Sequence, residues 1–494
     1  MVRKVEEIKP NLVDRVISWF SPEKAYYRMA YRHAEQEMRN YNAARWDRFG
    51  SGWEPVNQKP EETDAAFRDR IKARARDLER NSEIGNSVLL ALERNVIGQG
   101  IRPQARIKNE DGSDNEDLNQ RLEDLWEEWV YSCDVTEQST FYELQNMALR
   151  RMIVDGDSLA LNVYDTSDFP FKLQMLESDA LDTFNSYAKN KRVFSGVEVN
   201  DQYKPLAYWI YEDELSLPLK GRNFTSKRIS ADRILHLFIK KRPQQVRGMS
   251  YFAPIMGRVR DMDEYLDAEL MASRIAACFA AFIKTKAPGD RIGRQSKTVD
   301  GKRRETLEPG IMEYLLPGED VSFSDPPRPN TKANEFIQMQ LRLSGAGVGQ
   351  SYEMISRDVS QVNYSSARQA HLEDRQGFKV LQQFIKDHFC RPIWLEFVTA
   401  CVLAGKVRIP DYFSNIKRYT KSVWITPGWQ WVDPLKEAAG TQKELDMGIT
   451  SLSEICAARG KDWQEILDQI RREQEYAEKI GLMKEGGSIA KNSK

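Results

Sequence analysis

The segment 357–378, RDVSQVNYSSARQAHLEDRQGF, contains the side-chain types that active sites use. His371 could serve as a general base, and Ser365 or Ser366 could serve as the nucleophile that it activates. The spacing argues against this chemistry, because the histidine lies about a turn and a half farther along one predicted helix and no orienting carboxylate is identified. A solvated helix face is the better interpretation of His371, and a mechanical role is the better hypothesis for the segment.

Other residues that could carry chemistry have simpler structural interpretations. DGDS at 155–158 could place carboxylates around a metal, but Asp and Gly favour a turn leading into a strand. GQG at 98–100 follows a predicted helix, as a helix C-terminus does, whereas a dinucleotide fingerprint opens a helix. His388 and Cys390 lie two residues apart on a predicted helix and do not share a face. Without a Walker A, zincin, hydrolase or paired CxxC motif, the sequence predicts no metal, no cofactor and no catalysis.

The composition is that of an ordinary folded protein. The chain has 494 residues, of which 41% are hydrophobic and 30% charged, so more than one structural region is expected. Its formal net charge of −1 means that a nucleic-acid role would depend on local patches or on weak contact. The scattered cysteines form no CxxC pair, which predicts reduced, buried thiols in a cytosolic protein. They are Cys133, Cys278, Cys390, Cys401 and Cys456.

No targeting or membrane segment is predicted. The N-terminal stretch lacks the apolar core of a secretory signal. The most apolar runs, AACFAAFI and FVTACVLAG, are far shorter than the roughly 20 residues that span a bilayer. We therefore expect a cytosolic product without membrane association.

The N-terminal half combines helical and strand patterns. A charged helical pattern covers 63–80, and a third helix is expected over 119–132. Between them, a helix should begin with Ser82 or the preceding asparagine as its N-cap and end before Gly98. The third helix should bury Leu122, Leu125, Trp126 and Trp129. Short β-rich runs then fill 157–240, where GVEVNDQYKPLAYWIYE predicts two strands joined by a turn.

Long helical patterns dominate the C-terminal half. Apolar residues recur at three- and four-residue steps over 250–284, which predicts a rod of roughly 45 Å. Its second half, around AACFAAFI, is apolar on nearly all sides. Another helix should cover 331–343 and end in a flexible stretch that contains Gly345, Gly347 and Gly349.

Two sequence signals mark later helix starts. The S-x-x-Q spacing from Ser366 predicts a capping box and a helix to residue 404 that Pro392 kinks. The S-x-x-E spacing from Ser451 opens a last helical pair, which should break at Gly460. SVWITPGWQWVDP, between these helices, has a strand-like pattern, and residues 484–494 should be disordered.

Seven stretches carry a family resemblance when they are read in order. They are RARDLERNSEIGNSVLLALERNVIGQGIRPQ, LRRMIVDGDSLALNV, RGMSYFAPIMGRVRDMDEY, FSDPPRPN, NYSSAR, WQWVDPLKEA and GITSLSEICAARGKD. Together they resemble the portal proteins of tailed bacteriophages, of the lambda type, over most of residues 70–482. The chain departs from the family in carrying Asp157 where a glutamate usually follows DG, and residues 1–60 match only loosely.

The resemblance implies an α+β portal fold and a ring, usually dodecameric, at one capsid vertex. The terminase large subunit would drive double-stranded DNA through the channel without sequence specificity, and the DNA would leave by the same route at ejection. The major capsid protein and head-completion or tail-connector proteins would contact the ring. The ring would assemble in the host cytoplasm and become part of the virion.

The resemblance also divides the chain into parts. We expect an N-terminal segment (1–62), a wing (63–248, with a return at 406–445), a first stem helix (250–284), a clip (285–330), a second stem helix (331–349), a tunnel loop (350–365), a kinked wing helix (366–404), a crown (446–482) and a disordered tail (483–494).

Two sets of site residues follow as hypotheses. The tunnel loop would offer DNA short, exchangeable contacts from Ser356, Arg357, Asp358, Ser360, Gln361, Asn363, Tyr364 and Ser365. The clip would present a basic set to partners or to the channel mouth: Lys284, Lys286, Arg291, Arg294, Lys297, Lys302, Arg303 and Arg304. A merely solvated basic loop, and a tunnel loop that packs on the wing and never meets DNA, are the alternatives.

Two other functions stay open. A carboxylate-dependent DNA-processing enzyme of phage origin would need clustered Asp and Glu at strand ends, and none stands out. A sequence-reading DNA-binding protein would need a basic domain and a helix-turn-helix, and neither is found. A conduit agrees better with the near-neutral charge, because every phosphate contact must be released as DNA moves.

Overall fold

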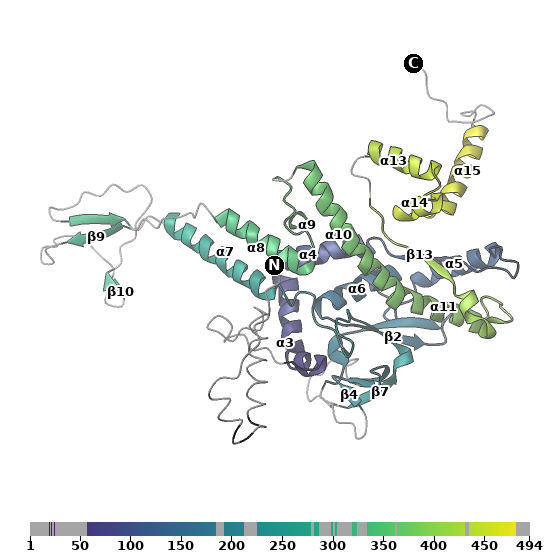
Figure 1. Cartoon of the computed structure of the whole chain (residues 1–494), viewed down its shortest axis with the longest axis horizontal. Coiled ribbons are helices and arrows are strands. Elements are labelled where there is room, and N and C mark those ends of the chain that lie inside the picture. The colour runs from purple at the N-terminus through teal and green to yellow at the C-terminus, as the bar shows by residue number, and fades with distance from the viewer. Residues whose placement is uncertain are drawn as a thin grey trace, which may run out of the picture. The chain divides into compact units, whose positions relative to one another are not determined.

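The computed structural model describes most of the chain after residue 56. The described residues are 57–183, 192–211, 225–277, 333–360, 363–429 and 434–480, the strands at 281–285, 298–299, 302–303 and 319–323, and Trp19, Ser21 and Lys24. Residues 1–59 and 60–494 form two separate units. All of the elements below belong to the second unit (Figure 1).

The first helices follow the capping signals of the sequence. Helix α3, Pro60–Asn81, begins with a proline and two glutamates, which suit a helix N-terminus. Ser82 caps α4, Glu83–Leu92, by accepting a hydrogen bond from the Gly85 amide. The helix continues as a π-helical turn, η2, over Glu93–Ile97 and ends at Gly98, whose φ of 53° is left-handed. The predicted cap and the predicted end before Gly98 are both confirmed.

An aromatic core joins elements that are distant in sequence. It is built from α5 (Glu116–Val130), α6 (Phe141–Val154) and α11 (Arg391–Leu403). Trp126 lies at its centre, with ring-centroid distances of 5.3 Å to Trp394 and 5.0 Å to Phe397. The predicted buried face of α5 is confirmed, because Leu122, Leu125, Trp126 and Trp129 are all buried.

The strands form small antiparallel sheets, as the short β-rich runs predicted. The three-stranded sheet has the order β3-β2-β8 and the four-stranded sheet the order β4-β5-β6-β7. The members are β2 (Ser158–Tyr164), β3 (Phe171–Leu176), β4 (Arg192–Phe194), β5 (Val197–Val199), β6 (Pro205–Tyr211), β7 (Ser226–Ser230) and β8 (Ile234–Leu237). The predicted β5–β6 hairpin is confirmed. Helices α6 and α11 pack on β2 and β3, respectively.

A third sheet joins the two ends of the unit. Strand β1, Arg102–Ala105, pairs antiparallel with β13, Ser422–Ile425, which lies about 320 residues later. The strand-like pattern of SVWITPGWQWVDP is confirmed for its first four residues, which form β13, whereas 426–429 are not in a strand. Only tertiary structure could reveal its partner.

The predicted rod over 250–284 is shorter than expected. Helix α7 spans Met256–Ala277, and the end of the apolar run forms strand β9, Ala281–Thr285, instead of more helix. Strand β9 pairs with β12, Glu319–Phe323, and the Phe, Ile and Thr that it contains favour strands. Short apolar runs do not distinguish buried helix from strand by themselves. A second small hairpin joins β10, Thr298–Val299, to β11, Lys302–Arg303.

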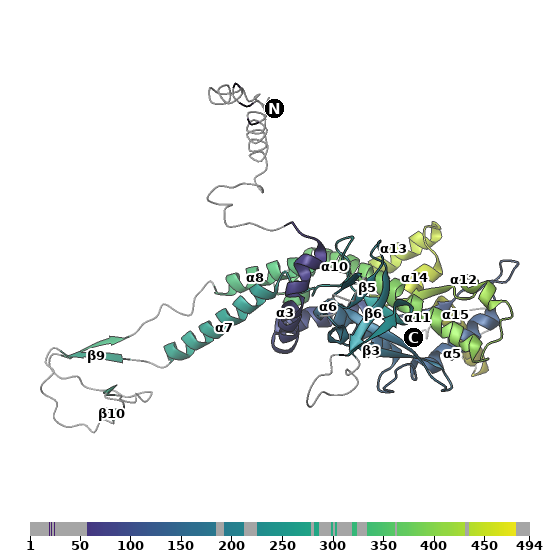
Figure 2. The same ribbon diagram turned by 90° about the horizontal axis from the view of Figure 1, so that it is seen from below.

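Helix α8, Ala333–Val348, extends past the predicted end. Gly345 and Gly347, expected in a flexible stretch, lie in its last turns, and Gly349, with φ of 62°, follows it. The reason is close packing, because a Cβ on Gly345 would lie 2.5 Å from the Gln350 carbonyl oxygen. A Cβ on Gly347 would lie 2.5 Å from Ile255. Helices α7 and α8 lie side by side in both views (Figures 1 and 2).

The predicted tunnel loop contains a short helix, α9, Tyr352–Ser356. The next helix, α10, spans Tyr364–Ile385 and starts earlier than predicted. Its N-cap is Asn363, which accepts from the Ser366 amide at 2.9 Å, so the predicted capping box from Ser366 is wrong. Asn and Ser cap helices about equally well, and the extended backbone of Asn363 decided between them.

The interruption expected at Pro392 takes the form of a π-helical turn. Helix α10 continues through η6, Lys386–Cys390, into α11, where the proline occupies the first turn. A π-turn shifts the hydrogen-bond pattern just where proline lacks an amide donor.

The last elements also follow their caps. They are α13 (Pro434–Asp446), α14 (Leu452–Ala458) and α15 (Trp463–Lys479). The predicted capping box at Ser451 and Glu454 is confirmed, and the chain turns at Gly460, with φ of 72°. Residues 484–494 lie outside the described residues.

Four cysteines are free and buried, as predicted: Cys133, Cys390, Cys401 and Cys456. Cys278 lies outside the described residues. Within the ranges given above, no helix has both the length and the apolar character needed to cross a bilayer.

Candidate functional site

The predicted tunnel loop is anchored to the body of the protein at its start. Ile355 of α9 is buried at 3% exposure, and its carbonyl oxygen accepts from the Ser87 hydroxyl at 2.7 Å. The Gln350 side chain, also buried, donates to the Val88 carbonyl oxygen at 3.3 Å. These contacts fasten 350–355 to α4.

A carboxylate of α10 holds the same segment from the other side. Asp374 accepts from the backbone amide of Ser351 at 2.8 Å and from its hydroxyl at 2.6 Å. Ser351 in turn caps α9. Burial raises the pKa of Asp374 above its ordinary value, although the bonds from Ser351 act in the opposite direction.

The following turn is built from its own polar side chains. Ser356 donates to the Tyr352 carbonyl oxygen at 2.7 Å, and Asp358 accepts from the Ser360 amide at 2.9 Å. The Tyr352 hydroxyl also donates to Asp358, at 3.1 Å. Arg357 adopts left-handed backbone, with φ of 57°, and its side chain is exposed. Ser356 and Asp358 are therefore engaged locally, and Arg357 is the charged side chain that this turn presents to solvent.

The other predicted loop residues divide by position. Asn363 caps α10, while Ser360 and Ser365 are exposed. Tyr364 belongs to the first turn of α10, but its side chain, like residue Gln361, lies outside what the structure describes.

The predicted basic set falls in the region of the small hairpins. Lys284 lies in β9, paired with Asp320, and Lys302 and Arg303 lie in β11. Their side chains are outside the described part. So are Lys286, Arg291, Arg294, Lys297 and Arg304.

The stretch that suggested catalysis brings no such site together. His371 is half-buried on α10, near Asp374, whereas Ser365 and Ser366 are exposed in the first turn of the same helix. Among the described residues, no three His, Cys, Asp or Glu side chains lie close enough together to hold a metal ion.

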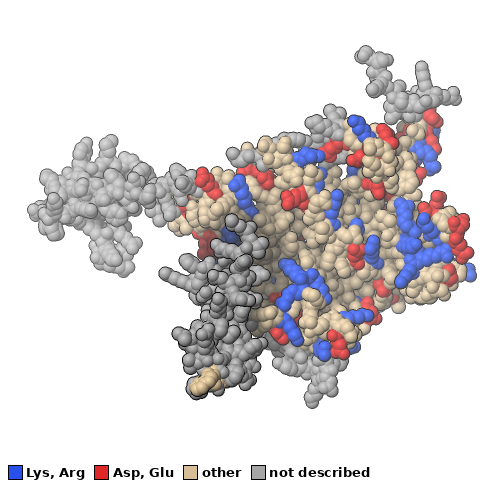
Figure 3. Space-filling view, in the orientation of Figure 1, with Lys and Arg blue, Asp and Glu red and all other residues tan. Residues whose placement is uncertain are grey.

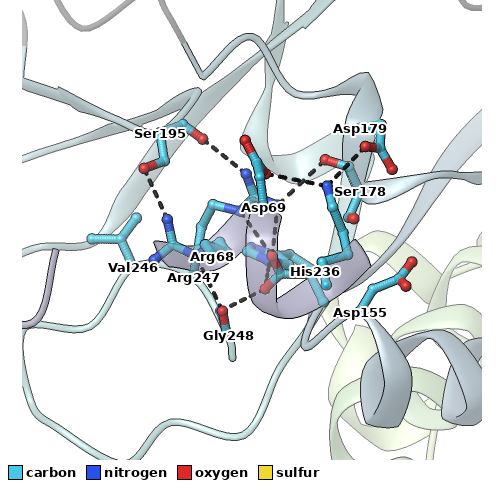
Figure 4. Close-up of polar contacts among 12 residues, drawn as sticks. Arg68, Asp69, Asp155, Ser178, Asp179, Ser195, His236, Val246, Arg247 and Gly248 are labelled. Atoms are coloured by element: carbon cyan, nitrogen blue, oxygen red, sulfur yellow. Dashed lines mark hydrogen bonds and ion pairs between the residues drawn. The ribbon is translucent and has the colours of Figure 1, made fainter. Parts of the chain in front are cut away.

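Sequence reasoning missed a buried charge cluster beside the β2–β3–β8 sheet (Figure 4). Asp157, expected only as a turn residue, is fully buried and pairs with Arg247, whose exposure is 1%. Its carboxylate accepts from the Arg247 Nε at 2.8 Å and from the Gly248 amide at 2.5 Å. It also lies 3.1 Å from the His236 Nε2.

The electrostatics of Asp157 are set by its partners. Burial by itself raises the pKa of Asp157, but the charge of Arg247 and the hydrogen bond with His236 outweigh burial and hold the pKa below its usual range. The carboxylate is therefore ionised, and the cluster is an ion pair rather than a proton-transfer site.

Helix α3 supplies the second half of the cluster. Arg68 and Glu61 form a buried pair at 3.0 Å. The other Glu61 oxygen accepts from the amides of Val246 and Arg247, at 3.1 Å each, and Arg68 Nε donates to the Gly248 carbonyl oxygen at 3.2 Å. Thus α3 holds the backbone that leads into α7.

A bidentate pair on the same helix extends the network. Arg76 donates to both oxygens of the buried Asp155, at 2.8 and 2.7 Å. These hydrogen bonds raise the pKa of Arg76 above its ordinary value. Together the pairs connect α3, the α6–β2 turn and the residues that lead into α7. We call this connection the joint; its role is structural and not catalytic.

The sequence contained a signal for this joint. The two stretches VDGDS and RGMS were both part of the family resemblance, although they are about 90 residues apart. In the structure their glycines touch: a Cβ on Gly248 would lie 1.9 Å from the Gly156 carbonyl oxygen. Glycine at both places permits the backbones to approach closely enough for Asp157 to be enclosed.

Comparison with known proteins gives the class of this chain. The family model described as phage portal protein, lambda family, matches residues 47–382. Portal proteins are structural components of the virion at the capsid vertex. The chain belongs to the lambda family of phage portal proteins.

Curated relatives agree over nearly the full length. A probable portal protein of Halomonas phage phiHAP-1 is 27% identical over 464 residues, covering 90% of this chain and 88% of its own. Portal protein B of Escherichia phage lambda is 24% identical over 482 residues, covering 88% and 89%. Among solved structures, a chain from the neck of a native gene transfer agent particle is 14% identical, covers 78% of this chain and 93% of its own, and has a TM-score of 0.40.

Proposed function

We propose that this chain assembles into a ring, dodecameric as its family implies, that conducts double-stranded DNA through one capsid vertex. Terminase packages DNA through the ring, and the DNA leaves by the same path at ejection. The major capsid protein surrounds the ring, and head-completion and tail proteins attach to it. Assembly takes place in the host cytoplasm, before the ring becomes part of the virion.

The observation that carries ring assembly is the exposed apolar surface of α7 and α8. Six large apolar side chains on these helices are between 39% and 55% exposed: Leu266, Leu270, Met271, Phe336, Met339 and Leu343. Full burial of such a side chain contributes about 1.5–3 kcal/mol. An apolar surface of this kind on a helix pair supports packing against another copy of the same chain.

The helix pair is braced internally, so it can present this surface as one unit. The rings of Tyr265 and Phe336 make an edge contact at 5.1 Å between centroids. Arg258 of α7 donates to Gln340 of α8 at 2.7 Å. Beside them is a hollow of about 420 Å³ that is lined by residues of both helices, and Met262 is one of the lining residues.

The observed elements suggest bounds for the functional parts. Helices α7 and α8 would be the stem, and the β9–β12 region between them the clip. The DNA-facing loop would be confined to 357–363, because 350–355 is anchored to α4 and α10 and the Ser356 hydroxyl donates to the Tyr352 carbonyl oxygen. The α3–β8 region with α10, α11 and β13 would be the wing, and α14 with α15 the crown.

The charge distribution supports passage of DNA without strong retention. In Figure 3, Lys and Arg side chains on the visible face form separate groups interspersed with Asp and Glu. At the start of the loop, the polar side chains of Ser356 and Asp358 are engaged in local hydrogen bonds. Few fixed contacts with phosphate then have to be broken as DNA advances. The proposed function is therefore mechanical, with no catalytic step.

Ring assembly is tested by placing a charge on the apolar surface. Leu270→Glu and Met339→Glu should each abolish the ring, because a carboxylate cannot be buried unpaired in a helix contact. Light scattering and negative-stain microscopy should show native particles many times heavier than the 57.2 kDa chain, and smaller species for the variants.

The matched control is Leu403→Glu, which changes a 69% exposed leucine at the end of α11 and should leave the ring intact. A native protein that stays monomeric at high concentration, with no ring in micrographs, would contradict the proposal.

A further inference from the structure

The helical pair α14–α15 contacts the rest of the protein through two small patches. One is a close approach of backbones, in which a Cβ on Gly428 would lie 2.3 Å from the Ala458 carbonyl oxygen. Gly460, which joins the two helices, comes near the same segment, because its Cβ would lie 2.9 Å from the Gly428 amide. Among the described residues of α14 and α15, Cys456 is the one buried side chain. The attachment therefore depends little on apolar burial.

The second patch is polar and faces strand β1. Asp462, the N-cap of α15, accepts a hydrogen bond from the Gln104 side chain. Gln464 accepts from Gln104 and from Arg106, at 3.3 Å each. The start of α15 is thus held on the edge of the β1–β13 sheet by side-chain amides and one guanidinium.

A glutamate of the body lies behind this patch. Glu123 of α5 is half-buried and accepts from the Ala105 amide of β1 at 2.7 Å. The charges of Asp462 and Glu465 act on it from the docked helix α15, and the charge of Arg106 acts on it from the residue that follows β1. The charges of Arg102 in β1 and Glu127 in α5 act on Glu465 in turn.

The two nearby arginines, Arg106 and Arg102, contact groups other than Glu123. Arg106 donates to the side-chain Oε1 of Gln104 at 2.6 Å as well as to Gln464. Arg102 lies 5.7 Å from the ring centroid of Tyr142. No residue that the structure describes forms an ion pair with Glu123. Ionised, it would repel two carboxylates of the helix that docks on it.

We propose that this contact is a pH-sensitive latch, in which protonated Glu123 holds α14–α15 on the body and ionised Glu123 loosens it. The inference uses contacts within one chain and does not depend on the ring or on DNA. It assigns to the C-terminal helical pair a docked and a loosened state.

The direction of the pH effect follows from the electrostatics. Burial raises the pKa of Glu123 to about 7, and the charges of Asp462 and Glu465 add to this rise. Burial also raises the pKa of Glu465. A carboxyl whose pKa is raised in the docked state stabilises that state at low pH and loses this contribution as the pH increases through the raised value. Docking should therefore weaken between about pH 5 and pH 8.

The test is hydrogen exchange of the native full-length chain, with rates corrected for the intrinsic effect of pH. Between pH 5.5 and 8.5, protection of the α14 and α15 amides should fall about tenfold. This change is smaller than the one that the whole pKa shift would give, because Glu123 is partly exposed and solvent screens its charge. Glu123→Gln keeps the acceptor for Ala105 but has no charge, so most of this change should disappear. Glu465→Gln removes a facing charge and should move the midpoint to lower pH.

Glu128→Gln, an exposed change on the same helix, is the control and should behave like the native chain. Protection that does not vary with pH in the native chain would overturn the latch. So would an undiminished change in Glu123→Gln, or a loss of the change in Glu128→Gln. Particle mass measured alongside tells a failure of the latch from a failure of ring assembly.

Discussion

At the scale of single residues, the charges of Asp157 and Arg247 are buried together with their partners. Asp157 and Arg247 are both almost completely buried, which would be costly for either alone. The carboxylate is satisfied by the guanidinium, an imidazole and a backbone amide, so the pair fixes geometry more than it adds stability. By contrast, among the described residues nothing accepts a hydrogen bond from the exposed Arg357 guanidinium. That difference separates the structural joint from the loop proposed to meet DNA.

Three substitutions of Arg357 separate its charge from its backbone strain. Arg357→Asn and Arg357→Gly remove the charge while tolerating the left-handed conformation, whereas Arg357→Lys keeps both charge and strain. If the side chain meets phosphate, the Asn and Gly variants should retain packaged DNA less well and show a salt dependence weaker by about one phosphate contact per chain. The Lys variant should behave like the native protein. DNA retention in purified particles at increasing salt is the measurement.

Arg70→Asn, at an exposed site on α3, is the control and should have no effect. Native retention in all three Arg357 variants would mean that the side chain is only solvated.

At the scale of elements, the joint between α3, the α6–β2 turn and the start of α7 depends on the contact of two glycines. Gly248→Ala would force a Cβ to within 1.9 Å of the Gly156 carbonyl oxygen and would open the enclosure of Asp157. We expect a loss of at least about 3 kcal/mol in the free energy of unfolding, the scale of disrupting a buried ion pair. Chemical denaturation of the purified protein is the measurement.

Gly257→Ala is a matched control nine residues later. A Cβ there meets nothing within 4 Å, and alanine favours the helix that this residue occupies. It should leave stability equal or slightly higher. Equal stabilities of the two variants would show that the α6–β2 turn and the α7 lead-in are not held together as described.

At the scale of the whole molecule, a formal charge of −1 hides local concentrations of charge. The basic set between α7 and α8 is the strongest of these in the sequence. Reversal of Lys302, Arg303 and Arg304 to Glu should leave the particle mass unchanged, because the proposed assembly surface is apolar and lies on the helices. It should reduce terminase binding and tail attachment, measured by pull-down and by infectivity.

Reversal of three exposed lysines elsewhere, Lys240, Lys241 and Lys421, controls for net charge. Unchanged packaging and infectivity in the clip variant, or equal loss in the control, would make the basic set an ordinary solvated loop.

Local sequence patterns were sufficient to predict the structure where a pattern is compatible with only one local structure. Ser82 and Ser451 cap the helices that their spacing predicted, Trp126 and its neighbours are buried, and the short β-rich runs are strands. Such features depend on side chains and backbone within a few residues of each other. The family resemblance was likewise carried by short stretches, and the family match confirmed it.

Tertiary structure decided the rest, because the competing local states differ little in free energy. The apolar run after Ala277 becomes strand β9 since β12 is available to pair with it. Gly345 and Gly347 stay helical because neighbouring atoms require the absence of a side chain. Asp157 reads as an ordinary turn residue until Arg247, about 90 positions away, and the α3 pair enclose it. Long-range pairing of buried charge leaves no local periodicity, so the joint became visible only once the chain was folded.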